Sequence, residues 1–210
     1  DDYLEIADAS FLNNTDYTIF VLEKRLSNSN DNYFIGDSSV TTDNETLVLG
    51  YNTNTSIIHS QGSSSSYNST VETYANYSNK PRLFTFSSDS AKGKKTYING
   101  TLASEDEANI SQLSNITSLS IGKGYDGEIG EIVIFTRALK TSEIKDVEDY
   151  ISKKWNAPNN RDSVNSCLGG TVTVEGCIQQ CQVNVVGSSD TTPKDDGESG
   201  AIACNQTGYD

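Results

Sequence analysis

Short apolar segments alternate with clusters of Asn, Ser, Thr, Asp and Gly over the first 156 residues of this 210-residue chain. This pattern is typical of an all-β sandwich, whose strands are short and whose turns are rich in these polar residues. Residues 18–22 and 132–135 are apolar at consecutive positions, which predicts two central strands covered on both faces. The strands predicted are residues 3–6, 17–22, 33–35, 47–51, 56–59, 70–74, 83–86, 95–98, 118–121 and 129–135.

Turns and loops are also visible in the sequence. Asn99-Gly100 lies between strand-like flanks and readily adopts the positive φ values of a type I′ turn, so we expect a hairpin over residues 95–103. Residues 61–66 and 87–95 have no apolar periodicity and are expected to be surface loops, either mobile or competent for binding.

One helix is predicted to follow Thr141, which we expect to be its N-cap. Ile144, Val147, Ile151 and Trp155 recur at helical spacing and form one apolar stripe. We expect this stripe to lie against the sandwich with Trp155 largely buried.

The balance of charges limits the partners of the chain. The net charge is −14, from 29 acidic and 15 basic residues, so a phosphate backbone would be repelled and nucleic acid is not expected as a partner. The N-terminus lacks a basic flank followed by an apolar region, and no apolar run is long enough to span a membrane. We expect a mature or excised soluble piece of a protein.

All the cysteines lie near the C-terminus, which predicts a second unit over residues 157–210. An even number of cysteines in an acidic, loop-rich chain favours disulfides and an extracytoplasmic location. Zinc is the alternative, but the spacing is not that of paired C-x2-C ligands and the single His59 is far upstream. One of three possible pairings joins Cys181 to Cys204 and Cys167 to Cys177, in a small β module; the four cysteines are Cys167, Cys177, Cys181 and Cys204.

Residues 127–155, GEIGEIVIFTRALKTSEIKDVEDYISKKW, resemble the closing strand and helix of laminin-G-like, concanavalin A-like jelly-roll domains of bacterial surface proteins. DDYLEI at residues 1–6 is similar to the end of an early strand of that family, and TYING at residues 96–100 is similar to its hairpin. The positions that match the closing pattern are Gly127, Ile129, Glu131, Ile132, Ile134, Phe135, Arg137, Ala138 and Leu139.

This resemblance implies an all-β, concanavalin A-like jelly-roll sandwich over residues 1–156 with one C-terminal amphipathic helix. Because DDYLEI usually follows earlier strands in the family, the chain is expected to lack those strands and to have an open sheet edge. A laminin-G-like domain with a cysteine-containing tail also resembles the ectodomains of some prepilin-like bacterial proteins, which are anchored by an N-terminal helix.

Catalytic groups are not evident in the sequence. Jelly-roll glycoside hydrolases need two facing carboxylates, and the usual E-x-D-x-x-E strand pattern is absent. Glu128 and Glu131 are three residues apart, so we expect them on opposite faces of a strand. His59 has strand-like neighbours, and a nucleophilic triad would have no other imidazole as its base. The chain is therefore not expected to be an enzyme.

Calcium is a possible cofactor, with Asp2, Asp126 and Glu128 as the candidate ligands, because carboxylate oxygens suit this ion. The family commonly has Asp before Glu131, where this chain has Gly130, which argues against a calcium site carried over from the family.

Tyrosines beside polar segments are the candidate ligand-binding residues, because an exposed ring can stack on a sugar; the alternative is that they are half-buried strand residues. We expect a non-catalytic recognition or adhesion module on a bacterial surface, binding glycans or glycoproteins through loops at the sandwich edge. The alternative is a structural ectodomain of a pilin-like or surface-assembly subunit. The candidate tyrosines are Tyr51, Tyr67, Tyr74, Tyr77 and Tyr125.

Overall fold

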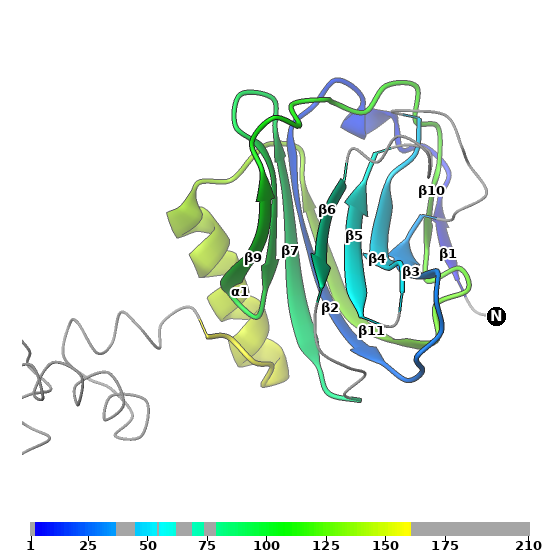
Figure 1. Cartoon of the computed structure of the whole chain (residues 1–210), viewed down its shortest axis with the longest axis vertical. Helices are drawn as coiled ribbons and strands as arrows, with labels where there is room; N and C mark the ends of the chain where they lie inside the picture. Colours follow the sequence, from blue (N-terminus) through cyan, green and yellow to red (C-terminus); the bar gives the residue numbers. More distant parts are fainter. Residues whose placement is uncertain (1–2, 37–44, 54, 62–68, 74–78, 161–210) are drawn as a thin grey trace, which may run out of the picture. The chain divides into compact units, whose positions relative to one another are not determined.

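A computed structural model describes residues 3–36, 45–53, 55–61, 69–73 and 79–160, with two antiparallel sheets that form a sandwich (Figure 1). The six-stranded sheet runs in the order β1 (Leu4–Ile6), β10 (Leu119–Ile121), β3 (Asn32–Ile35), β4 (Val48–Tyr51), β5 (Ser56–Ser60) and β6 (Ser69–Thr73). The five-stranded sheet runs in the order β11 (Gly127–Phe135), β2 (Tyr17–Arg25), β7 (Arg82–Asp89), β8 (Gly93–Ile98) and β9 (Thr101–Asp106). A 3-10 turn, η1 (Ser10–Leu12), and one helix, α1 (Thr141–Trp155), complete the described elements. The predicted all-β jelly-roll class is confirmed.

The main core lies between the two sheets. The ring of Phe34 on β3 stacks on that of Phe84 on β7, with ring centroids 5.5 Å apart, and completely buried Ile19 and Val21 of β2 belong to the same cluster. A second apolar cluster, which includes Phe20 and Leu22, lies on the opposite face of β2, beneath helix α1. Both faces of β2 are therefore covered, which explains why residues 18–22 are apolar at consecutive positions.

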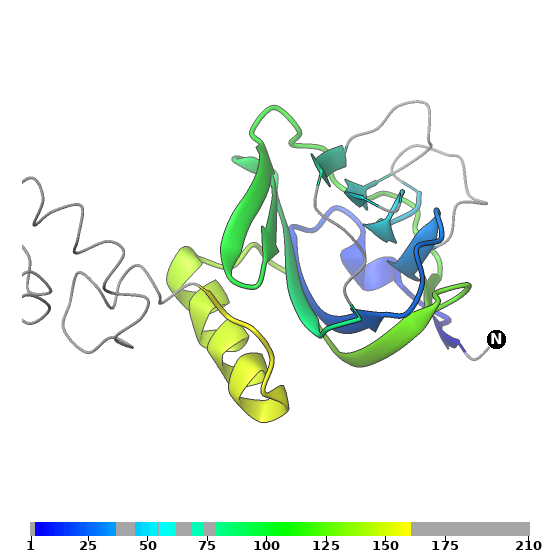
Figure 2. The ribbon, with the colours of Figure 1, turned by 60° about the horizontal axis from the view of Figure 1, so that its bottom comes forward.

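Strand β11 is also covered on both faces, but it is not central. Ile132 and Ile134 pack on the main core, whereas Val133 and Phe135 pack in the cluster beneath α1. In the sheet order β11 stands at the edge of the five-stranded sheet, so the predicted central position is wrong. The second face of β11 is covered by helix α1, so the strand is apolar on both faces although it lies at the sheet edge. Figure 2 shows this helix on the outer face of the sandwich.

A β-bulge in β11 corrects a second expectation. The pairing with β2 shifts register between Ile129 and Glu131, so Gly130 is the extra residue. Glu128 pairs with Lys24 and Glu131 with Leu22, two positions apart on β2. Because alternate residues of a strand share a face, Glu128 and Glu131 lie on the same face and not on opposite ones.

The hairpin between β8 and β9 is confirmed. Asn99 and Gly100 have φ values of 48° and 81°, which a type I′ turn requires. The loop predicted over residues 87–95 is largely wrong, because β7 continues to Asp89 and β8 begins at Gly93. Lys94 and Ser88 form part of this pairing, and their backbone hydrogen bonds override the weak apolar pattern of the segment.

Helix α1 begins at Thr141, with Lys140 and not Thr141 as its N-cap. Ile144 and Ile151 are buried as predicted, but 45% of the Trp155 side chain is exposed, so its predicted burial is wrong. Trp155 lies in the last turn, where its indole N–H donates to Glu131 Oε2 at 2.6 Å across the edge of β11. In the described part of the chain no helix has both the length and the apolar character that a membrane span needs. The predicted cysteine unit, residues 157–210, lies almost wholly outside the described residues.

Candidate functional site

The first hollow, the edge groove, lies between the open edges of the two sheets and has a volume of about 510 Å³. Strand β1 pairs only with β10, and β11 pairs only with β2, so each presents one unpaired backbone edge within the described residues. The side chains along the groove are mainly apolar. It is lined by Tyr3, Leu4, Ile121, Gly122, Tyr125, Gly127, Ile129, Gly130, Glu131 and Ile132.

Tyr125, one of the candidate tyrosines, forms part of the wall of this groove. Its hydroxyl donates a short hydrogen bond to Glu23 Oε2 in the interior. Gly127 leaves room for the ring, because a Cβ atom at this position would lie 2.4 Å from a ring carbon of Tyr125. Burial, followed by the negative charge of Glu23, raises the pKa of the Tyr125 phenol. The hydroxyl is therefore hydrogen-bonded in the interior, and only the ring of Tyr125 lines the groove, where a ligand could contact it.

Tyr51 was expected beside a polar loop but is completely buried, so its predicted role as an exposed stacking residue is wrong. Its hydroxyl donates to Glu23 Oε1 at 2.8 Å and accepts from Arg82 at 3.1 Å. The Arg25 guanidinium lies 4.1 Å from the centre of its ring. Tyr51 therefore helps to satisfy a buried acid. Tyr67, Tyr74 and Tyr77 lie outside the described residues.

Glu23 is the acid at the centre of this network and was not singled out from the sequence. It is 1% exposed, and burial raises its pKa, while the two tyrosine hydroxyls and the arginines favour the charged form. Glu23 follows four apolar residues on β2, and its neighbours in the sequence do not explain why an acid is buried here. Its hydrogen-bond partners come from β4, which carries Tyr51, and from the segment before β11, which carries Tyr125. No local sequence signal identifies such a long-range network.

The calcium ligands cannot be assembled from the described residues. Glu128 forms an ion pair with Lys24 at 3.1 Å, and the backbone N–H of Asp126 donates to Asn32 Oδ1 at 2.8 Å. Asp2 lies outside the described residues, and those residues contain no group of three or more His, Cys, Asp or Glu side chains placed to hold a metal. The calcium site stays a prediction.

Glu131 and His59, for which no catalytic role was predicted, have structural partners. Glu131 accepts hydrogen bonds from Lys154 at 2.9 Å and from Trp155. His59 is confirmed as a strand residue of β5 and is completely buried, with its Nε2 atom hydrogen-bonded to the Tyr17 hydroxyl at 2.8 Å. Burial lowers the pKa of His59 well below its usual value, so the ring is neutral.

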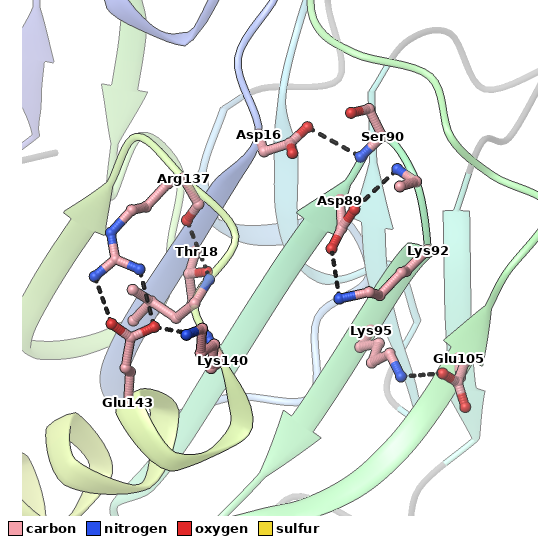
Figure 3. A network of polar contacts seen from close by, with 12 residues as sticks. Asp16, Thr18, Asp89, Ser90, Lys92, Lys95, Glu105, Arg137, Lys140 and Glu143 are labelled. Carbon is pink, nitrogen blue, oxygen red and sulfur yellow. Dashed lines mark hydrogen bonds and ion pairs between the residues drawn. The ribbon is translucent and has the colours of Figure 1, made fainter.

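The second hollow, the polar cleft, has a volume of about 210 Å³ and lies between the β7–β8 turn and the start of α1. Figure 3 shows the charged and hydroxyl side chains in this region of the sandwich. Its polar lining comes from both elements, and Tyr97, Leu139 and Ile144 are the apolar members. The polar members are Ser87, Asp89, Lys92, Lys95, Lys140 and Thr141.

Ion pairs hold three cationic side chains in the region of the polar cleft, those of Lys92, Lys95 and Arg137 (Figure 3). Lys92 lies 3.6 Å from Asp89, and Lys95 pairs with Glu105. Arg137 donates two hydrogen bonds of 2.8 and 2.9 Å to Glu143, which also accepts from the backbone N–H of Lys140. The Arg137 hydrogen bonds lower the pKa of Glu143 to about 2, so this carboxylate is charged under all ordinary conditions.

The sequence pointed to only one side of the polar cleft. Residues 87–95 were expected to be a surface loop, either mobile or competent for binding, and Ser87, Asp89, Lys92 and Lys95 come from this segment. The other side comes from Lys140 and Thr141, about 50 positions along the chain, and only the docking of α1 brings them together.

Within the described residues, the two antiparallel sheets and the helix packed on one of them define a jelly-roll sandwich. The sequence model of the Laminin_G_3 family, described as the concanavalin A-like lectin/glucanases superfamily, matches residues 1–145. The chain belongs to this family. No curated protein matches the chain.

Solved structures with the same fold include the binding domain of botulinum neurotoxin DC in complex with SialylT, at 12% identity and a TM-score of 0.55 over 71% of this chain. The serotype G binding domain has 18% identity and a TM-score of 0.50 over 66% of the chain. The botulinum neurotoxin DC domain in complex with rat synaptotagmin II has 12% identity and a TM-score of 0.50 over 65% of the chain. The matches cover 39%, 37% and 36% of those chains, so this domain corresponds to less than half of each, and the likeness is one of fold.

Proposed function

We propose that this domain is a non-catalytic, extracytoplasmic recognition module of a bacterial surface protein that binds glycans or glycoproteins through the polar cleft. The observation that supports this proposal best is the composition of the cleft. Hydroxyl and ion-paired side chains surround an apolar floor that includes Tyr97, Leu139 and Ile144. A sugar ring presents hydroxyl groups at its rim and C–H groups on its faces, and a pocket with a few placed polar groups over an apolar lining complements both.

The charges around the cleft favour an acidic sugar. The chain as a whole has a net charge of −14, yet Lys92, Lys95 and Lys140 all line this one hollow. Asp89 and Glu105 form ion pairs with Lys92 and Lys95, and each ammonium group still has N–H donors for a further hydrogen bond. A sugar carboxylate would find several charge-assisted donors together in this cleft, despite the acidic charge of the chain. The structure of the botulinum neurotoxin DC binding domain with SialylT is a precedent from a protein of the same fold.

The test is a glycan-array screen followed by calorimetry on the sugars that bind. We expect Lys140→Ala and Lys92→Ala each to weaken binding by about tenfold or more, because each removes a charged donor. Lys24→Ala is the matched control, since Lys24 is also a surface lysine paired with an acid but does not line the cleft. An array without any binding, or equal affinities of all three variants, would contradict the proposal.

The edge groove favours the second candidate function, a structural subunit of a surface assembly. A free strand edge binds an extended segment by backbone hydrogen bonds, and an adjacent apolar groove accepts its alternate side chains. The occupant would be a strand of a neighbouring subunit, laid along β11. Leu4, which is 69% exposed in the groove, should then be part of the contact.

Sedimentation of the chain over a range of concentrations tests this candidate. We expect Leu4→Lys to abolish self-association, whereas Leu102→Lys on β9 should leave it intact, because Leu102 is 45% exposed but lies on a strand outside the groove. A chain that stays monomeric at every concentration would argue against assembly between its own copies.

A further inference from the structure

Lys94 on β8 is completely buried, which is rare for a lysine. Its Nζ atom lies 2.5 Å from Asn109 Oδ1, closer than in an ordinary hydrogen bond. The backbone oxygen and the hydroxyl of Ser111 lie 3.5 and 3.3 Å from the same nitrogen. These three partners are neutral oxygen atoms. Their hydrogen bonds offset only a small part of the free energy that a buried ammonium loses with its hydration.

The short contact places the lysine nitrogen against an amide carbonyl group. A carbonyl bond is about 1.2 Å long, so Nζ lies within about 3.7 Å of the Asn109 side-chain carbonyl carbon. That is close to the separation of about 3–3.5 Å from which a nucleophile attacks. Asn109 is only 7% exposed, so little water competes for this carbon.

The neighbouring groups suit the attack of an amine on an amide. Burial lowers the pKa of Lys94 to about 8, which makes the neutral, nucleophilic amine accessible near neutral pH. The hydroxyl of Ser111 donates to Asn109 Oδ1 at 2.9 Å, where negative charge would develop. Asp106 stands directly opposite Lys94 on β9, and its negative charge acts on the lysine.

We propose that Lys94 and Asn109 are joined by an intramolecular amide bond that forms after folding. The neutral Nζ attacks the side-chain carbonyl carbon of Asn109, and the hydroxyl of Ser111 stabilises the oxyanion. The Asp106 carboxylate takes the proton from the attacking nitrogen and returns it to the amide nitrogen, which leaves as ammonia. One C–N bond forms, one C–N bond breaks, and no oxidant or cofactor is needed.

The cross-link would close a covalent loop that contains β9. Strand β9 is the edge strand of the five-stranded sheet, and Lys94 lies at the far end of its hairpin from the Asn99-Gly100 turn. A covalent bridge restricts the unfolded chain, as a disulfide does. The sandwich, whose described residues include no cysteine, would thus have a cross-link of its own that reducing agents do not break.

The test is the mass of the reduced and denatured wild-type chain. We expect a mass lower than that of the sequence by one molecule of ammonia, and a branched peptide that joins residues 94 and 109 after proteolysis. Loss of ammonia at Asn99-Gly100 through a cyclic imide would give the same mass, but it would leave only linear peptides. The full sequence mass, or linear peptides for both residues, would overturn the proposal.

Two variants complete the experiment. Lys94→Arg keeps the positive charge but offers no amine nucleophile, so we expect the full sequence mass and no branched peptide. Lys95→Arg is the matched control, because Lys95 is the next residue of the same strand and pairs with Glu105 on the opposite face; it should form the cross-link as the wild type does. A branched peptide that persists in Lys94→Arg would also refute the assignment. If Lys94→Arg fails to fold, the wild-type mass decides the question.

Discussion

His59 should make the stability of the sandwich depend on pH between about pH 6.5 and 5. The ring is completely buried, and the ring of Phe86 lies 5.3 Å away. Its Nδ1 atom has no hydrogen-bond partner, so the interior offers no acceptor for an N–H at this position when the ring carries both protons. Burial lowers the pKa of His59 well below its usual 6.5. The folded ring therefore stays neutral over a range in which the unfolded ring takes up a proton.

The sign and size of the effect follow from linkage. Because the unfolded chain binds the extra proton, the contribution of His59 is complete above pH 6.5 and is lost as the pH falls below it. The unfolded ring is half protonated at about pH 6.5 and almost fully protonated at about pH 5, so the slope rises from half of about 1.4 kcal/mol per pH unit toward the full value. With the folded ring neutral throughout, about 1.6 kcal/mol of stability is lost between these two pH values. Burial raises the pKa of Glu23, whose protonation in the folded state works in the opposite direction as the pH falls.

Urea denaturation followed by circular dichroism at both pH values measures this loss. His59→Gln should lack it, because glutamine does not titrate and still reaches Tyr17 with a polar group. Glu23 and the surface acids are common to both proteins, so their effects cancel when the two pH dependences are subtracted. Equal pH dependences for the wild type and His59→Gln would show that the reasoning about the buried neutral ring is wrong.

Three further results are expected. Ile151→Ala should cost about 2–5 kcal/mol in urea denaturation, because this side chain of α1 is completely buried against the five-stranded sheet. Half-exposed Trp155 should show quencher-accessible fluorescence, and its truncation should cost less. Gly36→Ala should destabilise far more than Gly124→Ala, since its Cβ would lie 2.0 Å from a carbonyl oxygen while that of Gly124 meets nothing within 4 Å; equal melting temperatures would contradict this. Thiol titration of the unreduced, denatured chain should detect no free cysteine if both proposed disulfides form.

The sequence predicted those parts of the fold that depend on local chemistry. The Asn99-Gly100 turn follows from two residues that tolerate positive φ, and the strands follow from short apolar runs. The family model matches residues 1–145, a range that includes these strands and the closing strand β11. Helix α1 was found from its stripe, but Trp155 was misplaced, because spacing does not show where the supporting sheet ends.

The interior polar groups could not be predicted in the same way. Glu23, Lys94 and Tyr51 are buried with partners from other strands and loops of the sandwich, and nothing beside them in the chain distinguishes them from surface residues. The candidate site failed for the same reason. A tyrosine next to Asn and Thr was expected on the surface, whereas the strand that carries Tyr51 turns its ring into the core. Lys140 lines the polar cleft only because α1 packs against the sheet, and the sequence around Lys140 does not show this packing.

The bulge at Gly130 has a consequence for how β11 chooses its alignment with β2. A strand that is apolar on both faces would bury a similar set of side chains after slipping by one residue, so hydrophobic burial alone distinguishes the two alignments poorly. In the observed alignment Glu128 meets Lys24, and Glu131 meets Lys154 and Trp155. After a one-residue slip both acids would turn toward the interior without these partners. Two acids and one glycine thus determine the register in which β11 pairs with β2.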